Sequence, residues 1–234
     1  MYTPEGGGYY ERNKTMSFEL PLFPLNVVLF PGADLPLHIF EPRYRQMINE
    51  CYTQGKPFGV VLVRPESEHL QEEPFPVGTL AEIEALVRLD DGRMNLIARG
   101  GKRFQIHSLH REKPYLSGLV ETFEDLPEIP ETLEACAKQV KELFQSYLEM
   151  LLEVAGKKGM QLDLPTDPIA LSHFVAYFLD IEDEEKQGLL ELNITSLRLE
   201  EEIYILRKEV PFIRQMLAMS KKYKAEGSDK SRLN

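Results

Sequence analysis

Cysteines are scarce in this sequence, long apolar runs are absent, and each shortage excludes a class of protein. Two cysteines, Cys51 and Cys136, are too few for a disulfide framework or a four-ligand zinc site. No apolar run approaches the roughly 20 residues that cross a bilayer, and the first residues lack the basic start and apolar centre of a signal peptide. We therefore expect a cytoplasmic protein with no membrane segment and with both thiols buried.

Basic residues are outnumbered as well, since 27 Lys and Arg stand against 38 Asp and Glu, which gives a formal net charge of −11. This balance argues against nucleic acid as a partner, because binding along phosphates draws on clustered Lys and Arg. The basic cluster in the first half surrounds Lys102 and Arg103, with Arg99 and Arg111 nearby, and lacks the interleaved aromatic residues that stack bases. RNA binding is kept as the alternative function.

Motifs for catalysis are missing. The Gly-Lys pairs at Gly55, Gly101 and Gly156 do not continue into Ser or Thr with the glycine spacing of a nucleotide-binding loop, and no serine lies in a Gly-x-Ser-x-Gly elbow. Pairs of acids are unavoidable among 38 carboxylates, so they give no support to a hydrolase. His107 and His110 would face opposite sides of a strand without a third ligand. We predict no catalytic residue, no cofactor and no metal.

The patterns that are present divide the chain into four parts. Residues 1–15 are polar and aperiodic, which predicts a loose leader. Residues 16–126 contain strand-like runs and turn signals, and residues 127–220 show helical spacing almost throughout. Residues 221–234 predict a polar tail. The fold class expected is α+β.

In the first half, about six short strands and one helix are expected. Pro42 can occupy the first turn of that helix and Gly55 can end it. Alternating residues on either side of Asp91-Gly92 predict a β-hairpin, and Gly100-Gly101 predict a bulge or bend in its second strand. These bends favour a partly closed barrel. His38 and His173 have apolar neighbours, so both are predicted to lie in a core.

In the second half, several helices should pack as a bundle. Asp167-Pro168 predicts a capped helix start, and a long helix follows with apolar residues spaced four and three apart from Leu199 to Leu217. That apolar seam is interpreted as buried in the bundle, with self-association as the alternative. Pro211 is expected to kink this helix.

Four motifs in order carry a family resemblance: PLFPLNVVLFPGADLPLHIFEPRYRQMI, PVGTLAEI, DDGRMNLIARGGKRFQI and YLSGLVE. Together with DEEKQGLLE in the second half, they resemble the amino-terminal substrate-binding domain of the Lon protease family over roughly residues 17–215. The resemblance implies a PUA-like pseudo-barrel followed by a helical bundle. It also implies a module that recognises polypeptides without cutting them.

In full-length family members this domain precedes an ATPase module and a Ser-Lys peptidase module. The present sequence ends about where the ATPase module would begin, so the resemblance implies a stand-alone protein without enzymatic activity. An adaptor in protein quality control is the expected role, with unfolded polypeptides or a protein partner as ligands.

The segment 19–48 is strongly apolar although five prolines interrupt it. In the structural interpretation, the prolines shape irregular edge strands while apolar side chains fill the barrel core, namely Leu22, Leu25, Leu37, Ile39 and Phe40. In the functional interpretation, an apolar patch around the Pro31-Gly32 turn stays partly exposed and binds polypeptide. The candidate residues of this patch are Val28, Leu29, Phe30 and Leu35.

Overall fold

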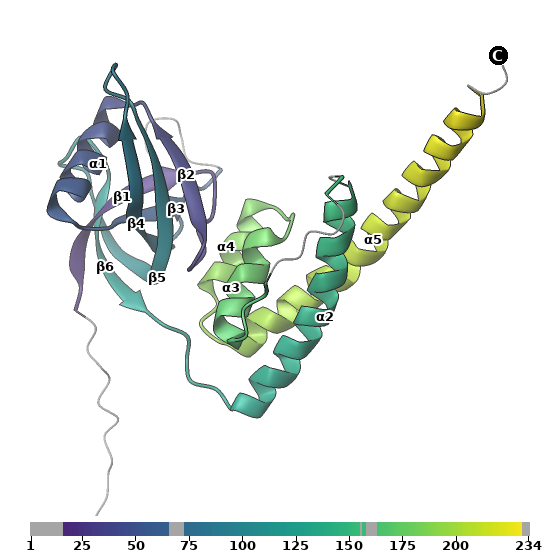
Figure 1. Ribbon diagram of the computed structural model, residues 1–234. Coiled ribbons are helices and arrows are strands. Elements are labelled where there is room, and N and C mark those ends of the chain that lie inside the picture. Colours follow the sequence, from purple (N-terminus) through teal and green to yellow (C-terminus); the bar gives the residue numbers. More distant parts are fainter. Residues whose placement is uncertain (1–15, 66–72, 155, 158–162, 231–234) are drawn as a thin grey trace, which may run out of the picture.

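The structure is a computed structural model that describes residues 16–65, 73–154, 156–157 and 163–230, with 220–230 given as backbone. A compact group of strands forms the first part of the chain and a set of helices forms the second (Figure 1). This arrangement confirms the predicted α+β class. The predicted leader, residues 1–15, lies outside the described residues.

The strands form one sheet that closes on itself. Its order is β2-β5-β4-β3-β1-β6, and an additional pairing between β5 and β6 joins five of the strands into a ring. β2 is attached to β5 outside this ring, and β1 and β3 run parallel to each other. The strand bounds are Phe18–Leu25 for β1, Asp34–Ile39 for β2, Phe58–Leu62 for β3, Val77–Arg88 for β4, Met94–His110 for β5 and Ser117–Phe123 for β6.

Helix α1, Pro42–Gln54, forms where the sequence predicts a helix, and it packs on the barrel core. Pro42 stands in its first turn, where a missing N–H removes no helical hydrogen bond. Gly55 ends the helix in the left-handed region with φ 61°. Its buried face includes Cys51, and burial raises the pKa of that thiol to about 11, so the group is an unreactive core side chain at neutral pH.

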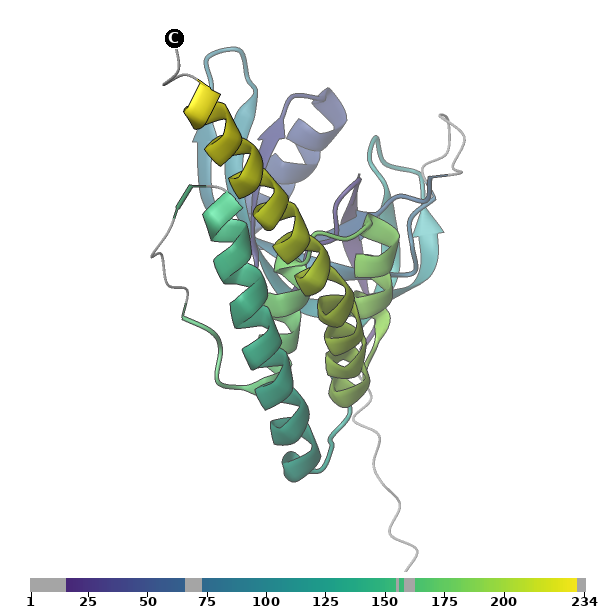
Figure 2. The same ribbon diagram turned by 90° about the vertical axis from the view of Figure 1, so that its right-hand side faces the viewer.

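The helical part contains α2 (Pro130–Val154), α3 (Pro168–Phe178), α4 (Asp183–Glu191) and α5 (Thr195–Lys230). The predicted cap of α3 is present, because an Asp167 carboxylate oxygen accepts a hydrogen bond from the Ala170 N–H at 2.8 Å. α2 and α5 lie side by side, and α5 continues well past α2 (Figures 1 and 2). α5 also runs through Pro211 and into the predicted polar tail as far as Lys230.

The apolar seam of α5 is buried within the bundle in its first half, which confirms the preferred interpretation. Leu199 and Leu206 are fully buried and Ile203 and Val210 nearly so, whereas Leu217 is half-buried. The bundle core also takes in side chains from α2, α3 and α4. No helix among the described residues is both long and apolar enough to cross a membrane.

A buried ionic cluster fastens the barrel to the helices. Asp125, in the segment between β6 and α2, pairs with both Arg103 of β5 and Arg198 of α5, and it accepts a hydrogen bond from the Thr195 hydroxyl at 2.9 Å. Arg103 also donates to the Leu190 carbonyl oxygen at 2.7 Å. One carboxylate therefore connects the strand, the linking segment and the last helix, and Arg103 has a structural role.

The electrostatics of this cluster follow from its burial. Burial alone would raise the pKa of Asp125, but hydrogen bonds and positive charge from Arg198 and Arg103 outweigh it and hold the pKa below its usual value. Burial also lowers the pKa of the Arg103 guanidinium to about 10. His173, on α3, is buried as predicted, and burial together with the two arginines lowers its pKa to about 3, so the ring is neutral.

Two side chains predicted to be buried are exposed. The inward residues of β2 are at odd positions, ending with the buried Ile39, so the even position places His38 on the outer face. Phe40 follows the last residue of the strand and is 60% exposed. The other predicted core residues face inward: Leu22 and Ile39 are buried, and Leu25 and Leu37 are half-buried against the core.

Candidate functional site

The predicted binding loop is a tight turn that folds back onto the sheet. Pro31 and Gly32 occupy its centre, with Gly32 at φ 78°, and the Ala33 N–H donates to the Phe30 carbonyl oxygen at 3.1 Å. The Gly32 N–H then bonds the Gly100 carbonyl oxygen at 2.8 Å. A Cβ on Gly100 would lie 2.2 Å from the Phe30 oxygen, so only glycine allows the turn to approach β5 this closely.

The turn is buried, so the expectation of a partly exposed patch is wrong for three of its four residues. Val28 is 4% exposed, Leu29 2% and Phe30 0%, while Leu35 is half-buried against the barrel core. Val28 and Phe30 belong to the helical core, and Leu29 belongs to the barrel core. The apolar character of this loop is explained by its position between two cores, which a single sequence does not reveal.

An exposed apolar surface lies instead on the outer face of β2, β5 and β4. Pairing across the three strands aligns their outward residues in rows, one of which contains Pro36, Ile97 and Ala85. The next row contains His38, Asn95 and Val87. These rows line a shallow hollow of about 410 Å³, which we call the outer-sheet groove, defined by Pro36, Leu37, His38, Ala85, Val87, Asn95, Leu96 and Ile97.

Large apolar side chains in this groove are exposed to solvent. Val87 is 59% exposed and Ile97 is 42% exposed, and the exposed Phe40 ring stacks on His38 at one end with 6.1 Å between ring centroids. The His38 ring is held by a hydrogen bond of 2.6 Å between its Nδ1 and the Asn95 side-chain oxygen. Such contiguous exposed apolar surface is typical of interaction sites. Two-residue alternation in the hairpin was the sequence signal that could have located it.

One end of the groove carries acidic side chains. The next row along the strands pairs Asp34 and Glu82 with Arg99 of β5, and Glu84 lies beside them. Arg99 Nη1 is 2.7 Å from a carboxylate oxygen of Asp34, and its Nε is 3.9 Å from one of Glu84. We call Asp34, Glu82 and Glu84 the acidic rim. Three carboxylates and one guanidinium in this row leave this end of the groove negatively charged.

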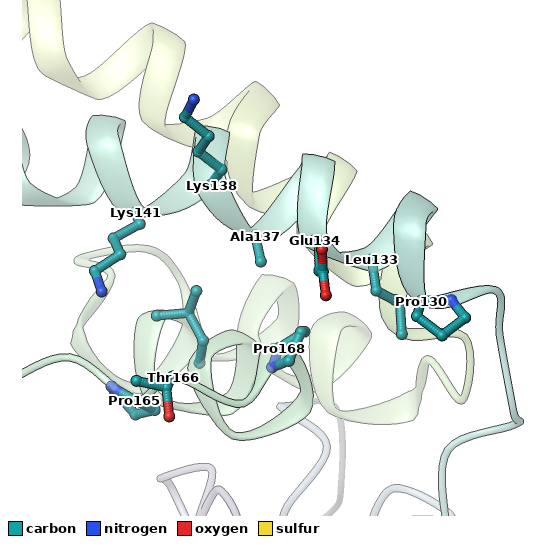
Figure 3. A pocket seen from close by; sticks show the side chains of 10 residues that line it. Pro130, Leu133, Glu134, Ala137, Lys138, Lys141, Pro165, Thr166 and Pro168 are labelled. Atoms are coloured by element: carbon teal, nitrogen blue, oxygen red, sulfur yellow. The ribbon is translucent and has the colours of Figure 1, made fainter.

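A second hollow, of about 350 Å³, lies between α2 and the start of α3 (Figure 3). Its apolar floor includes Leu133 and Ala137 of α2, which face Pro168 across the gap, whereas Lys138 points away from it. The large apolar side chains at this floor are partly or fully buried by the helices, since Leu133 is half-buried and Leu171 is buried. Leu133 and Leu171 are therefore more covered than Val87 and Ile97 of the outer-sheet groove are.

Three residues of the basic cluster considered for RNA are paired with acids. Arg99 bonds Asp34, the Lys102 ammonium lies 2.6 Å from a carboxylate oxygen of Glu124, and Arg103 is buried in the junction. His107 and His110 contact different carboxylates, those of Glu121 at 3.1 Å and Glu19 at 3.0 Å. Among the residues that the structure describes, no group of three or more potential ligands could hold a metal ion. These pairings weaken the alternative of RNA binding.

The outer-sheet groove is lined by apolar, imidazole and amide side chains, without a carboxylate, amine, hydroxyl or thiol among its lining residues. Residues 19–208 match the family model of the ATP-dependent protease La (LON) substrate-binding domain. The chain belongs to this family, as the resemblance of its motifs implied.

Full-length relatives and solved structures agree with this assignment. The chain is 29% identical over 210 residues to a Lon protease of Anaeromyxobacter dehalogenans, which covers 87% of the chain and 24% of that protein. A Lon protease of Flavobacterium johnsoniae is 28% identical over 77% of the chain and 23% of its own length. The chain thus spans about a quarter of the length of these relatives.

Two solved structures share the fold. The Lon N-terminal domain protein of Xanthomonas campestris is 26% identical, with a TM-score of 0.58, and the match covers 79% of this chain and 96% of that one. The N-terminal domain of the Mycobacterium avium complex Lon protease gives a TM-score of 0.62 over 81% of this chain and 98% of its own. Because its identity is 19%, this second likeness concerns the fold alone.

Proposed function

We propose that this protein is a non-catalytic module that binds exposed polypeptide segments and acts as an adaptor in protein quality control. The observation that carries the proposal is the outer-sheet groove, where Val87 and Ile97 are exposed on the face of the sheet. Membership of the substrate-binding family supports a polypeptide as the ligand. Burial of a few apolar side chains in a shallow groove favours weak to moderate affinity, which suits binding and release of many different clients.

The proposal can be tested with a permanently unfolded probe, such as reduced and carboxymethylated α-lactalbumin, alongside native α-lactalbumin. The full chain should bind the unfolded form and not the native form in a fluorescence anisotropy titration. A Val87→Ser, Ile97→Ser variant should bind about tenfold more weakly, because the loss of two apolar contacts of this size is worth about 1–2 kcal/mol.

A matched control uses exposed apolar residues far from the groove. Phe212→Ser, Met216→Ser on α5 removes comparable exposed side chains and should leave binding unchanged. Circular dichroism and urea unfolding establish that both variants fold. Equal binding of the unfolded probe by the wild type and a folded Val87→Ser, Ile97→Ser variant would rule out the groove as the binding site.

A further inference from the structure

From the geometry of the groove we infer which polypeptide segments it binds, an inference that rests on the proposed function. The occupant is an extended segment with apolar side chains at two alternate positions and a Lys or Arg at the next alternate position. The pattern is apolar-x-apolar-x-basic, or its reverse, because the sheet face alone does not fix the direction of the bound chain.

Spacing of the rows sets this pattern. Outward residues on one strand are two positions apart, which is about 6.6–6.8 Å, and side chains on one face of an extended peptide have the same spacing. An extended segment lying along β5 therefore places alternate side chains over Asn95, Ile97 and Arg99 in turn. The Ile97 row is apolar, the Asn95 row combines the exposed Val87 with the polar side chains of His38 and Asn95, and the third row is the acidic rim.

Charge complementarity identifies the third side chain. The carboxylates of Asp34 and Glu84 lie within 4 Å of the Arg99 guanidinium, both side chains are about half exposed, and Glu82 is paired with Arg99 across β4 and β5. One guanidinium compensates one of these charges, so a cation from the ligand would meet a net negative site beside Ile97. An acidic residue at the same position would be repelled, which gives the groove a preference among otherwise equally apolar segments.

The ligand is recognised by burial of its side chains on the face of the sheet, and not by pairing as an added strand at the edge of β2. β2 is the last strand in the sheet order, and among the described strands it pairs with β5 alone. Pro36 stands in the middle of β2 and has no N–H, so a chain added at that edge would lack one hydrogen bond of its ladder. The ligand is therefore read from the face of the sheet, where Ile97 and Val87 are exposed.

Two pairs of fluorescent peptides test the inference. The first pair has the cores Leu-Ser-Leu-Ser-Lys and Leu-Ser-Leu-Ser-Glu. The second pair has the reversed cores, which tests the opposite direction of the bound chain. In anisotropy titrations with the full chain, we expect the lysine peptide of one pair to bind about threefold to tenfold more tightly, as for one or two exposed ion pairs. The preference should shrink in high salt, because exposed charges are screened.

Variants assign the preference to the acidic rim. Glu82→Gln, Glu84→Gln should abolish the difference between the peptides, while Glu184→Gln, Glu185→Gln on α4 changes the net charge equally and should preserve it. Equal binding of both peptides to the wild type would overturn the charge inference and leave the proposed function standing. Failure to bind either peptide, in a chain that still binds unfolded α-lactalbumin, would overturn the pattern itself. If the wild-type chain bound neither the peptides nor unfolded α-lactalbumin, the proposed function itself would be contradicted.

Discussion

The turn around Phe30 and the outer face of β2, β5 and β4 are both apolar, but the turn is buried and the outer face is exposed. Phe30 is fully buried between the barrel and the helices, next to the His173 ring at 6.3 Å. Val87 and Ile97 are spread singly along two strands and remain exposed. The concentrated apolar run in the sequence is therefore part of the core, and the dispersed residues form the surface for which we propose binding.

A matched pair of phenylalanine substitutions tests this difference most directly. Phe30→Ala should lower the free energy of unfolding by about 4 kcal/mol, because it removes a buried ring and leaves a cavity where two cores meet. Phe40→Ala removes an exposed ring and should change the same quantity by less than about 1 kcal/mol. Urea denaturation followed by circular dichroism measures both.

The two stability changes decide whether the turn is a core element. If Phe30→Ala destabilised the protein no more than Phe40→Ala, the turn would not be a core element, and the sequence-based hypothesis of a binding patch around Phe30 would return. A large loss for Phe30→Ala alone would confirm that its conspicuous hydrophobicity serves the junction between barrel and helices.

Local signals in the sequence were sufficient to predict where helices of the fold begin and end. Pro42, Gly55 and the Asp167 cap act on their immediate neighbours, so their effects could be predicted from spacing alone. The site could not be predicted in this way, because exposure of the Phe30 turn depends on helices more than a hundred residues away. Alternation in the hairpin did indicate two faces, but the outer face became a groove only through its pairing with β2.

The ionic cluster at Asp125 offers a second test, because it holds together the junction that buries Phe30. Asp125→Asn should lower the free energy of unfolding by about 3 kcal/mol, since Arg103 and Arg198 would remain buried without a countercharge. The lowered pKa of Asp125 means that its stabilising contribution is present above the ordinary Asp pKa and is lost as the pH falls through the lower pKa of the folded state.

Comparison with an exposed ion pair controls for a general charge effect. Asp34→Asn removes the partner of Arg99 at the surface and should change stability by less than about 1 kcal/mol. The difference between wild type and Asp125→Asn should also decrease when unfolding is measured at progressively lower pH below about 4. A difference that does not vary with pH over that range would show that Asp125 does not act through its charge.

A smaller effect of opposite sign is expected at Glu202 of α5, where burial destabilises. Its side chain is fully buried, and neither carboxylate oxygen has a hydrogen-bond partner among the described residues. Burial raises the pKa of Glu202 well above its usual value, although the charge of Arg198 partly opposes this. As the pH rises above the ordinary Glu pKa, the unfolded chain releases a proton that the folded chain retains, so native stability falls.

Glu202→Gln should therefore raise the free energy of unfolding by about 1–2 kcal/mol at pH 7 and have less effect near pH 4. Its exposed neighbour provides the control, since Glu201→Gln should be nearly neutral at both pH values. A gain for Glu202→Gln that is equally large at pH 4 and pH 7 would indicate a packing effect instead of a retained proton.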